Sequence, residues 1–350
     1  MSGPRGITDV ESAETSAYVD PTMAERRVGS AVLRFNLVPH LAVFRLVPQR
    51  GDNFPKYTAG QYIALRRENC RLTKKIPDPG GGFQYVADTD ERGVVRRGPV
   101  THSYSIASAP FETEQERWLE FYVILEKNEV GEPGRLTESL FQIEPDEDDE
   151  IIYYTKIAGD FTLEKRAMGF KNIVMVGTGT GLAPFASMIK QLNHDAMQGR
   201  TTDTKFTLIH ANRTIHELGY HAPLHAIMEV GKLDFVYLPT VSRPASSDFE
   251  DPHIGKGRGN NMLRLLCDLP LLEEEILAEA GNSADRRVIA EAALRKAVMP
   301  LLPSYISKSD VQRRMPPAST LIMTCGNPTA MQDIGRIAKT VGASFTKEEW

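Results

Sequence analysis

Residues 171–184, KNIVMVGTGTGLAP, decide the fold of the second half of this chain. Their apolar run is typical of a parallel strand buried on both faces, and the glycines after it let the backbone approach an anion closely. The residues that follow read as a helix with Pro184 in its first turn. A strand, a glycine-rich turn and a helix start together predict a pyrophosphate site.

The glycine-rich turn departs from the dinucleotide fingerprint G-x-G-x-x-G, because Leu182 stands where the third glycine would be. Taken alone, the turn is therefore also compatible with a tight strand-to-helix connection that binds no ligand. The candidate phosphate-binding residues in it are Gly177, Thr178, Gly179, Thr180 and Gly181.

More strand and helix patterns follow the turn along the chain. They are KFTLIHANR, YHAPLHAIMEV, DFVYLPTVSR, a mainly helical insert near 271–299, and TLIMTCGNP before the helical MQDIGRIAKTV. Alternating strands and helices predict an α/β doubly wound parallel-sheet domain. We expect this domain over residues 169–350.

The chain before the turn has a different texture. Short β-type runs such as AVLRFNLVPHLAVFRLVP, GQYIALRR, VTHSYSIAS and WLEFYVILEK predict an antiparallel β-barrel or sheet over residues 26–168. The glycine- and proline-rich segment 76–99 predicts a long loop or hairpin, and EPDEDDE, residues 144–150, predicts an acidic turn. Residues 1–25 have no apolar period and read as a flexible tail.

Composition limits the classes of function. A chain of 350 residues with 41% hydrophobic and 25% charged residues fits about two globular domains. Its net charge of −5 argues against a nucleic-acid partner. Three cysteines without C-x-x-C spacing argue against a disulfide framework or a cysteine-bound metal, and no metal site is expected. Without an apolar leader or spanning segment, we expect a cytoplasmic protein with no membrane partner.

Arginines follow the strands of the expected parallel sheet. Arg213 ends one strand, Ser242 and Arg243 end the next, and Arg258 lies in the glycine-bracketed loop GKGRG. Each could be a solvated surface charge, but together at strand ends they are suited to clamp a phosphate. We therefore expect binding of NADPH in preference to NADH, since only NADPH carries a 2′-phosphate.

Four separated motifs and the last residue resemble one family, in its order along the chain. The motifs are His102-Ser103-Tyr104-Ser105, Gly134-Arg135-Leu136-Thr137, GTGTGLAP at 177–184 and Cys325-Gly326-Asn327-Pro328, and the last residue is Trp350. They resemble the ferredoxin–NADP reductase family, especially its bacterial ferredoxin/flavodoxin reductases.

The resemblance implies FAD on the β-barrel domain and NADP(H) on the α/β domain. It implies that Tyr104 stacks on the flavin, that Ser105 lies near flavin N5, and that Cys325 positions the nicotinamide; these three are the candidate catalytic residues. The first two motifs and Trp350 would bind FAD, with Arg135 as a counter-charge, and Gly326, Asn327 and Pro328 would bind the nicotinamide nucleotide. From the residues alone, GRLT also reads as a helix start with Thr137 as N-cap.

His102 departs from the family pattern, which has arginine there. An unperturbed histidine is only partly charged at pH 7, so we expect FAD affinity to fall as pH rises and His102→Arg to flatten that dependence.

The resemblance implies a carrier protein, ferredoxin or flavodoxin, as electron partner. Because such carriers are usually acidic, cations that flank the flavin motif in sequence are docking candidates, although a solvated loop without a partner fits them equally. The candidates are Arg66, Arg67, Arg71, Lys74, Lys75, Arg92, Arg96 and Arg97. Two other functions stay open: the reductase component of an oxygenase system, and a non-catalytic nucleotide-responsive binding protein with a decayed flavin site.

Overall fold

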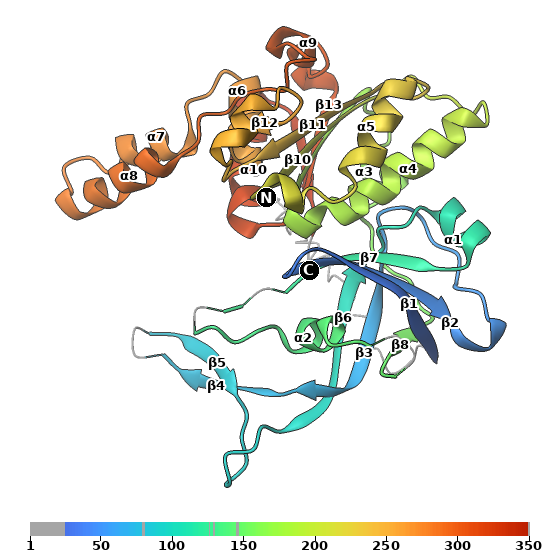
Figure 1. Ribbon diagram of the computed structural model, residues 1–350. Helices are drawn as coiled ribbons and strands as arrows, with labels where there is room; N and C mark the ends of the chain where they lie inside the picture. The colour runs from blue at the N-terminus through green and yellow to red at the C-terminus, as the bar shows by residue number, and fades with distance from the viewer. Residues whose placement is uncertain (1–24, 79–80, 126, 129, 145–146, 349–350) are drawn as a thin grey trace, which may run out of the picture.

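The computed structural model describes residues 25–78, 81–125, 127–128, 130–144 and 147–348. Two six-stranded sheets organise this part of the chain, one antiparallel and one parallel. Figure 1 shows the antiparallel sheet below and the parallel sheet above, with the chain passing from one to the other. The predicted tail lies outside the described residues except for Glu25.

The antiparallel sheet has the strand order β6-β3-β8-β1-β2-β7. Its strands are β1 Arg26–Val38, β2 Leu41–Pro48, β3 Tyr62–Arg71, β6 Arg97–Ser105, β7 Leu119–Ile124 and β8 Glu150–Tyr154. Just past β6, the Ala107 amide donates to the Glu120 carbonyl of the opposite edge strand, at 2.8 Å. The sheet therefore curls into a half-barrel, which confirms the predicted fold class of the first domain.

Strand β2, LAVFRLVP, is mostly apolar and has buried side chains on both faces. Ala42, Phe44 and Leu46 fill the core of the half-barrel. Leu41 and Val43, on the other face, join a core cluster that contains side chains of the parallel-sheet domain. Because side chains alternate across a strand, one strand serves both cores.

Shorter elements complete the first domain. They are β4 Thr73–Pro77, β5 Phe83–Ala87, α1 Pro110–Glu116, α2 Arg135–Phe141 and α3 Leu163–Arg166. Strands β4 and β5 pair into the hairpin expected in segment 76–99, and this hairpin extends away from the rest of the domain (Figure 1). In the acidic segment, Glu144 and Asp148 form a β-bridge; residues 145–146 lie outside the described residues.

The second sheet is parallel, as predicted, and its strand order is β12-β11-β10-β9-β13-β14. Its strands are β9 Asn172–Thr178, β10 Lys205–Asn212, β11 Phe235–Val241, β12 Gly255–Lys256, β13 Thr320–Cys325 and β14 Ser344–Lys347. The helices are α4 Ala183–Met197, α5 His221–Val230, α6 Gly259–Leu266, α7 Leu272–Glu279, α8 Ala284–Lys296, α9 Lys308–Gln312 and α10 Pro328–Val341.

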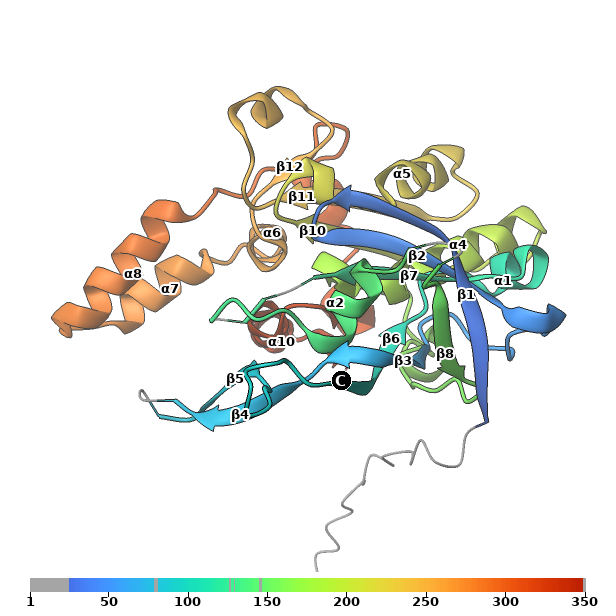
Figure 2. The ribbon, with the colours of Figure 1, turned by 60° about the horizontal axis from the view of Figure 1, so that its bottom comes forward.

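Helices cover both faces of the parallel sheet, which explains the apolar run of β9. Ile173 and Met175 pack on the side of α4 and α5, toward the half-barrel. Val174 and Val176 pack on the side of α6 and α10. Helices α7 and α8 confirm the predicted helical insert and form a hairpin that projects from this domain (Figures 1 and 2). Within the described residues, every helix is too short or too polar to cross a bilayer.

Candidate functional site

A pocket of about 770 Å³ lies between the two domains. It lies at the carboxyl ends of the parallel strands, at the point where the adjacent strands β9 and β13 are followed by helices on opposite faces of the sheet. Doubly wound sheets bind ligands at this position. We call it the junction pocket. The predicted site residues that line it are Ser103, Tyr104, Ser105, Thr137, Thr178, Gly179, Thr180, Gly181, Arg213, Ser242, Arg243, Arg258, Cys325, Gly326, Asn327 and Pro328.

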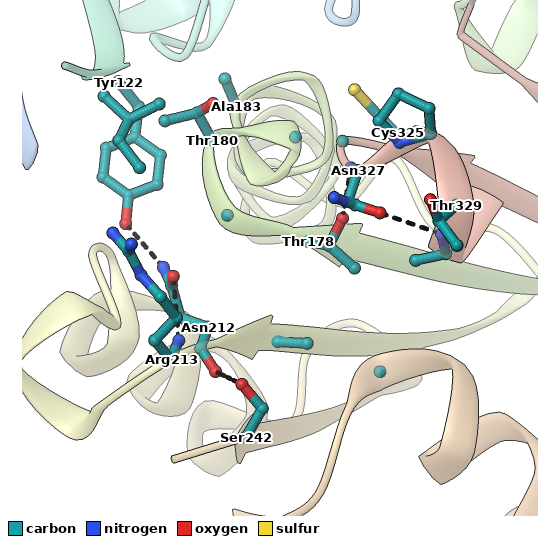
Figure 3. A pocket seen from close by; sticks show the side chains of 18 of the residues that line it. Tyr122, Thr178, Thr180, Ala183, Asn212, Arg213, Ser242, Cys325, Asn327 and Thr329 are labelled. Atoms are coloured by element: carbon teal, nitrogen blue, oxygen red, sulfur yellow. Dashed lines mark hydrogen bonds between the residues drawn. The ribbon is translucent and has the colours of Figure 1, made fainter. Parts of the chain in front are cut away.

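Two glycines let the loops after β9 and β13 interlock. A Cβ on Gly181 would stand 2.2 Å from the Cys325 carbonyl oxygen, and one on Gly326 would stand 2.2 Å from that of Thr178. The Thr178 hydroxyl oxygen accepts a hydrogen bond from the backbone N–H of Asn327 at 2.7 Å. Figure 3 shows these two residues next to each other. Glycine is required at positions 181 and 326 because the two backbones approach each other closely there. The hydrogen bond between Asn327 and Thr178 also holds the two loops together.

Asn327 has a local task besides its place in the pocket. Its side-chain oxygen accepts the Ala330 amide at 3.1 Å and so caps α10, while Pro328 begins the helix. Gly177 was predicted to bind phosphate, but it lies inside β9, outside the pocket lining, with Leu182 packed against it. The pocket side of the turn is therefore Thr178 to Gly181.

The half-barrel contributes an aromatic ring and hydroxyl groups. The Tyr104 ring packs edge-on against Phe121, with centroids 6.4 Å apart. Burial raises the pKa of Tyr104 to about 12, although its hydrogen bond with Thr137 opposes the shift. Tyr104 therefore stays neutral and offers a ring face together with a hydroxyl group.

The other residues of the two predicted flavin motifs lie outside the pocket lining. They are His102, Gly134, Arg135 and Leu136. Leu136 is a core residue of the half-barrel. Helix α2 has Gly134 as N-cap, so the reading of Thr137 as N-cap is wrong: Thr137 lies within the first turn and faces the pocket.

His102 carries less charge than an unperturbed histidine. Partial burial and then the nearby Arg135 cation lower its pKa. The Arg135 guanidinium lies close enough to His102 to contribute to this lowering and adds a positive charge beside it. The expected fall of FAD affinity with rising pH, and its flattening by His102→Arg, stay predictions.

A buried carboxyl group that the motifs did not reveal joins the two domains. Glu348, 4% exposed, accepts hydrogen bonds from the Ser105 hydroxyl at 3.2 Å and the Cys325 thiol at 2.9 Å. Burial raises the pKa of Glu348 to about 7, even though both donors oppose the shift. Burial and Glu348 raise the pKa of Cys325 well above its usual value, so this cysteine is a neutral thiol.

Glu348 reaches this position because β14 pairs in parallel with β13 and its amide donates to the Thr324 carbonyl at 3.0 Å. The signal in the sequence was the short β-type run SFTK before it, which marks an additional edge strand. The predicted FAD contact Trp350 lies outside the described residues.

The strand-end cations meet at one end of the pocket. Arg213 is held by the buried Glu217 carboxylate at 3.0 Å and contacts His40 of the half-barrel. The Arg243 amide donates to the Arg213 carbonyl at 2.8 Å, which continues the pairing of β10 and β11 and places both arginines side by side.

The third of these arginines, Arg258, lies in the loop before α6. Its Nη1 donates to the buried Glu273 carboxylate at 3.1 Å, while 61% of its side chain is exposed. Tyr122 and Asn212, which the sequence analysis missed, also line the pocket; their hydrogen bond, at 3.3 Å, ties the half-barrel to β10 (Figure 3).

Part of the predicted docking set is engaged within the protein. Arg66 pairs with Glu68, Arg71 pairs with Glu132 and Glu138, and Arg67 is only 6% exposed beside Asp148. Arg67 is therefore a wrong candidate, because a buried side chain cannot dock a protein. The remaining candidates are exposed: Lys74, Lys75, Arg92, Arg96 and Arg97. No cluster of three potential metal ligands occurs in the described part of the chain.

Comparisons with known proteins agree with this geometry. The model of the oxidoreductase NAD-binding domain family matches residues 175–257. A flavodoxin/ferredoxin–NADP reductase of Rhodobacter capsulatus is 29% identical over 235 residues, 64% of this chain and 75% of that protein. A ferredoxin–NADP reductase of Azotobacter vinelandii is 33% identical over 153 residues, 41% of this chain and 52% of that protein. This chain is thus similar in sequence to ferredoxin–NADP reductases, over 64% of its length in the Rhodobacter capsulatus comparison.

A solved structure extends the likeness to the whole fold. The ferredoxin NADP⁺ reductase of Neisseria gonorrhoeae, determined with bound FAD and NADP, superposes with a TM-score of 0.54. The superposition covers 93% of this chain and 98% of that one, at 20% identity. This chain thus shares the two-domain fold of that structure, from the half-barrel to the parallel sheet.

Proposed function

We propose that this chain is an FAD-dependent oxidoreductase that transfers electrons between NADP(H) and a one-electron carrier protein, ferredoxin or flavodoxin. The observation that carries the proposal is the junction pocket, where Ser105 of one domain and Cys325 of the other share the Glu348 carboxyl group. A pocket formed by both domains can hold two reacting rings in contact while the protein excludes water.

The pocket residues fit both cofactors. A volume of about 770 Å³ lies within the range, roughly 300–1,000 Å³, of small-molecule and cofactor sites. On the half-barrel, Tyr104 offers a ring on which a flavin could stack. Arg135, outside the pocket lining, would supply a cation to the phosphates. On the other side, Gly179 has open space where a Cβ would stand, so its backbone can approach a pyrophosphate.

Bound FAD would supply the exchange of a hydride with nicotinamide and of single electrons with a carrier. The chain's own residues would orient the two reacting rings and keep water away from them. The neutral Cys325 thiol and the Ser105 hydroxyl fix the two sides of the pocket through Glu348. With a pKa of about 7, Glu348 can hold or release a proton near neutral pH at the carboxyl oxygens that these two groups contact.

The pocket also supports a preference for NADPH. Arg213, Arg243 and Arg258 gather at the same end of it as Ser242. A hydrogen bond between charged groups contributes about 1.5–3 kcal/mol, so two such contacts to a 2′-phosphate give roughly 10²- to 10⁴-fold preference.

The exposed cations of the β4–β5 hairpin and its flanking loop support a role in attracting an acidic carrier. They lie toward the Arg97 end of β6, whereas Ser105 at the other end lines the pocket. At about 3.3 Å per residue the two ends are roughly 25 Å apart, so these cations would steer the carrier's approach.

The absorbance spectrum of the purified protein tests the proposal. We expect flavin bands that bleach when NADPH is added without oxygen, and ferricyanide reduction with kcat/KM far higher for NADPH than for NADH. A protein that stays colourless with excess FAD would reject the redox function and favour a decayed flavin site. Equal kcat/KM values would reject the phosphate clamp alone.

A further inference from the structure

The α7–α8 hairpin has no part in the function proposed so far, yet it begins at the rim of the junction pocket. Leu272, the first residue of α7, lines the pocket. Glu273 follows it and is 3% exposed. A buried carboxylate beside a pocket rich in arginine calls for a physical explanation, because its burial costs free energy unless it is paired.

The Glu273 carboxylate has two partners. One oxygen accepts Arg258 Nη1 at 3.1 Å, and the other accepts Asn261 Nδ2 at 2.8 Å. The Arg258 contact leaves Nε and Nη2 of that guanidinium for a ligand. Arg258 is otherwise mostly exposed, and an exposed arginine loses rotamer freedom when it binds a phosphate. The Glu273 contact removes part of that freedom beforehand.

Glu273 is itself held in place. The Leu272 amide donates to the Asn261 side-chain oxygen at 3.1 Å, which makes the link between α6 and α7 reciprocal. One turn further, the buried Arg264 binds both Glu275 of α7 and Asp333 of α10. The start of the hairpin is therefore held to α6 by hydrogen bonds and, through Arg264, to the ion pairs that α6 makes with α7 and α10.

We infer that Glu273 is a positioning residue for the 2′-phosphate of NADP(H): it holds Arg258 at the pocket rim and so makes the inserted hairpin part of the nucleotide-specificity site. This inference rests on the proposed NADP(H) function. A ligand with a 2′-phosphate benefits from a guanidinium fixed in advance, whereas a ligand with a free 2′-hydroxyl does not.

Calorimetric titration of the FAD-loaded protein with 2′,5′-ADP, which carries the 2′-phosphate without nicotinamide, tests the inference. We expect Glu273→Ala to raise the Kd about tenfold, the factor of one charge-assisted hydrogen bond, and to lower the preference for NADPH over NADH equally. Glu273→Gln, which keeps one acceptor oxygen, should lose less. Glu279→Ala removes the same charge at the exposed end of α7 and is the matched control.

The background of Arg258→Ala separates positioning from a general structural effect. If Glu273 acts through Arg258, Glu273→Ala causes no further loss in that background. Equal losses in both backgrounds, tighter binding of 2′,5′-ADP by Glu273→Ala, or a change matching that of Glu279→Ala would overturn the inference. A wild-type protein that binds neither 2′,5′-ADP nor NADPH would instead refute the proposed function.

Discussion

Glu348 illustrates how a single residue can join two domains and respond to pH. Its pKa of about 7 in the folded protein exceeds that of an ordinary glutamate, because burial disfavours the ionised form. The folded state therefore favours the protonated carboxyl group. This contribution is fully present below the pKa of the unfolded chain and is lost as pH rises through the folded value.

We predict that Glu348→Gln removes this pH dependence. Between pH 4 and pH 8, the wild-type free energy of unfolding should fall relative to that of the variant by about 3 kcal/mol, an order-of-magnitude value. Urea unfolding of both flavin-free proteins across this range measures it. Parallel curves for the two proteins would show that folding does not raise the pKa of Glu348.

We predict that Gly181→Ala disrupts the interlocked loops. Its Cβ would lie 2.2 Å from the Cys325 carbonyl oxygen, and backbone cannot move aside cheaply. The variant should lose more than about 3 kcal/mol of stability or fail to fold. Gly179→Asn is the matched control: its backbone has φ of +59°, with open space around it, so the cost should be about 1 kcal/mol. Thermal unfolding of both variants distinguishes overlap from backbone strain.

The site residues differed in how well the sequence revealed them. Ser105 and Cys325 belong to recognisable motifs next to strands, and the pocket brings them together. Glu348 was missed because its role depends on the pairing of a four-residue edge strand, which leaves a weak local pattern. The lowered pKa of His102 could not be read from the sequence, because burial and the proximity of Arg135 depend on tertiary structure.

At the scale of elements, a buried ion network joins three helices. Arg264 of α6, 1% exposed, donates to Asp333 of α10 and Glu275 of α7. We predict that Arg264→Met costs about 3–5 kcal/mol, because it leaves the fully buried Asp333 without its cation. Arg286→Met, on the exposed part of α8, should change stability by less than about 0.5 kcal/mol. Thermal or urea unfolding measures both; equal effects would mean that the network is dispensable.

Elements with strong periodicity were predicted well. The buried run of β9, the glycine turn and the amphipathic α10 follow from local patterns, as does the helical insert. For segment 76–99 the sequence left two alternatives open, a long loop or a hairpin. The short strands β12 and β14 were not predicted. The local sequence pattern could not show that α7 starts at the junction pocket. That position depends on contacts that Asn261 and Arg264 of α6 make with α7.

At the scale of the molecule, a net charge of −5 leaves any attraction for an acidic carrier to local cations. We predict that reversing Lys74 and Lys75 to glutamate lowers kcat/KM for the carrier about tenfold at low salt, and that added salt shrinks this difference. Steady-state turnover with ferredoxin or flavodoxin measures it.

Lys232→Glu is the control for the carrier experiment, because Lys232 is equally exposed but follows α5 in the other domain. A loss of the same size in Lys232→Glu would point to overall charge as the cause. A loss in the hairpin variant that does not depend on salt would exclude electrostatic steering.

The strands β2 and β7 bury one face inside the half-barrel and the other against the parallel-sheet domain, through Leu41, Val43 and Tyr122. If the two domains were separated, each would expose an apolar surface to water and would tend to aggregate. Recombination that replaces one domain of such a protein would therefore have to preserve an apolar contact surface that fits the other domain. Inheritance of the two halves as a unit thus depends on this contact, in which Leu41, Val43 and Tyr122 take part.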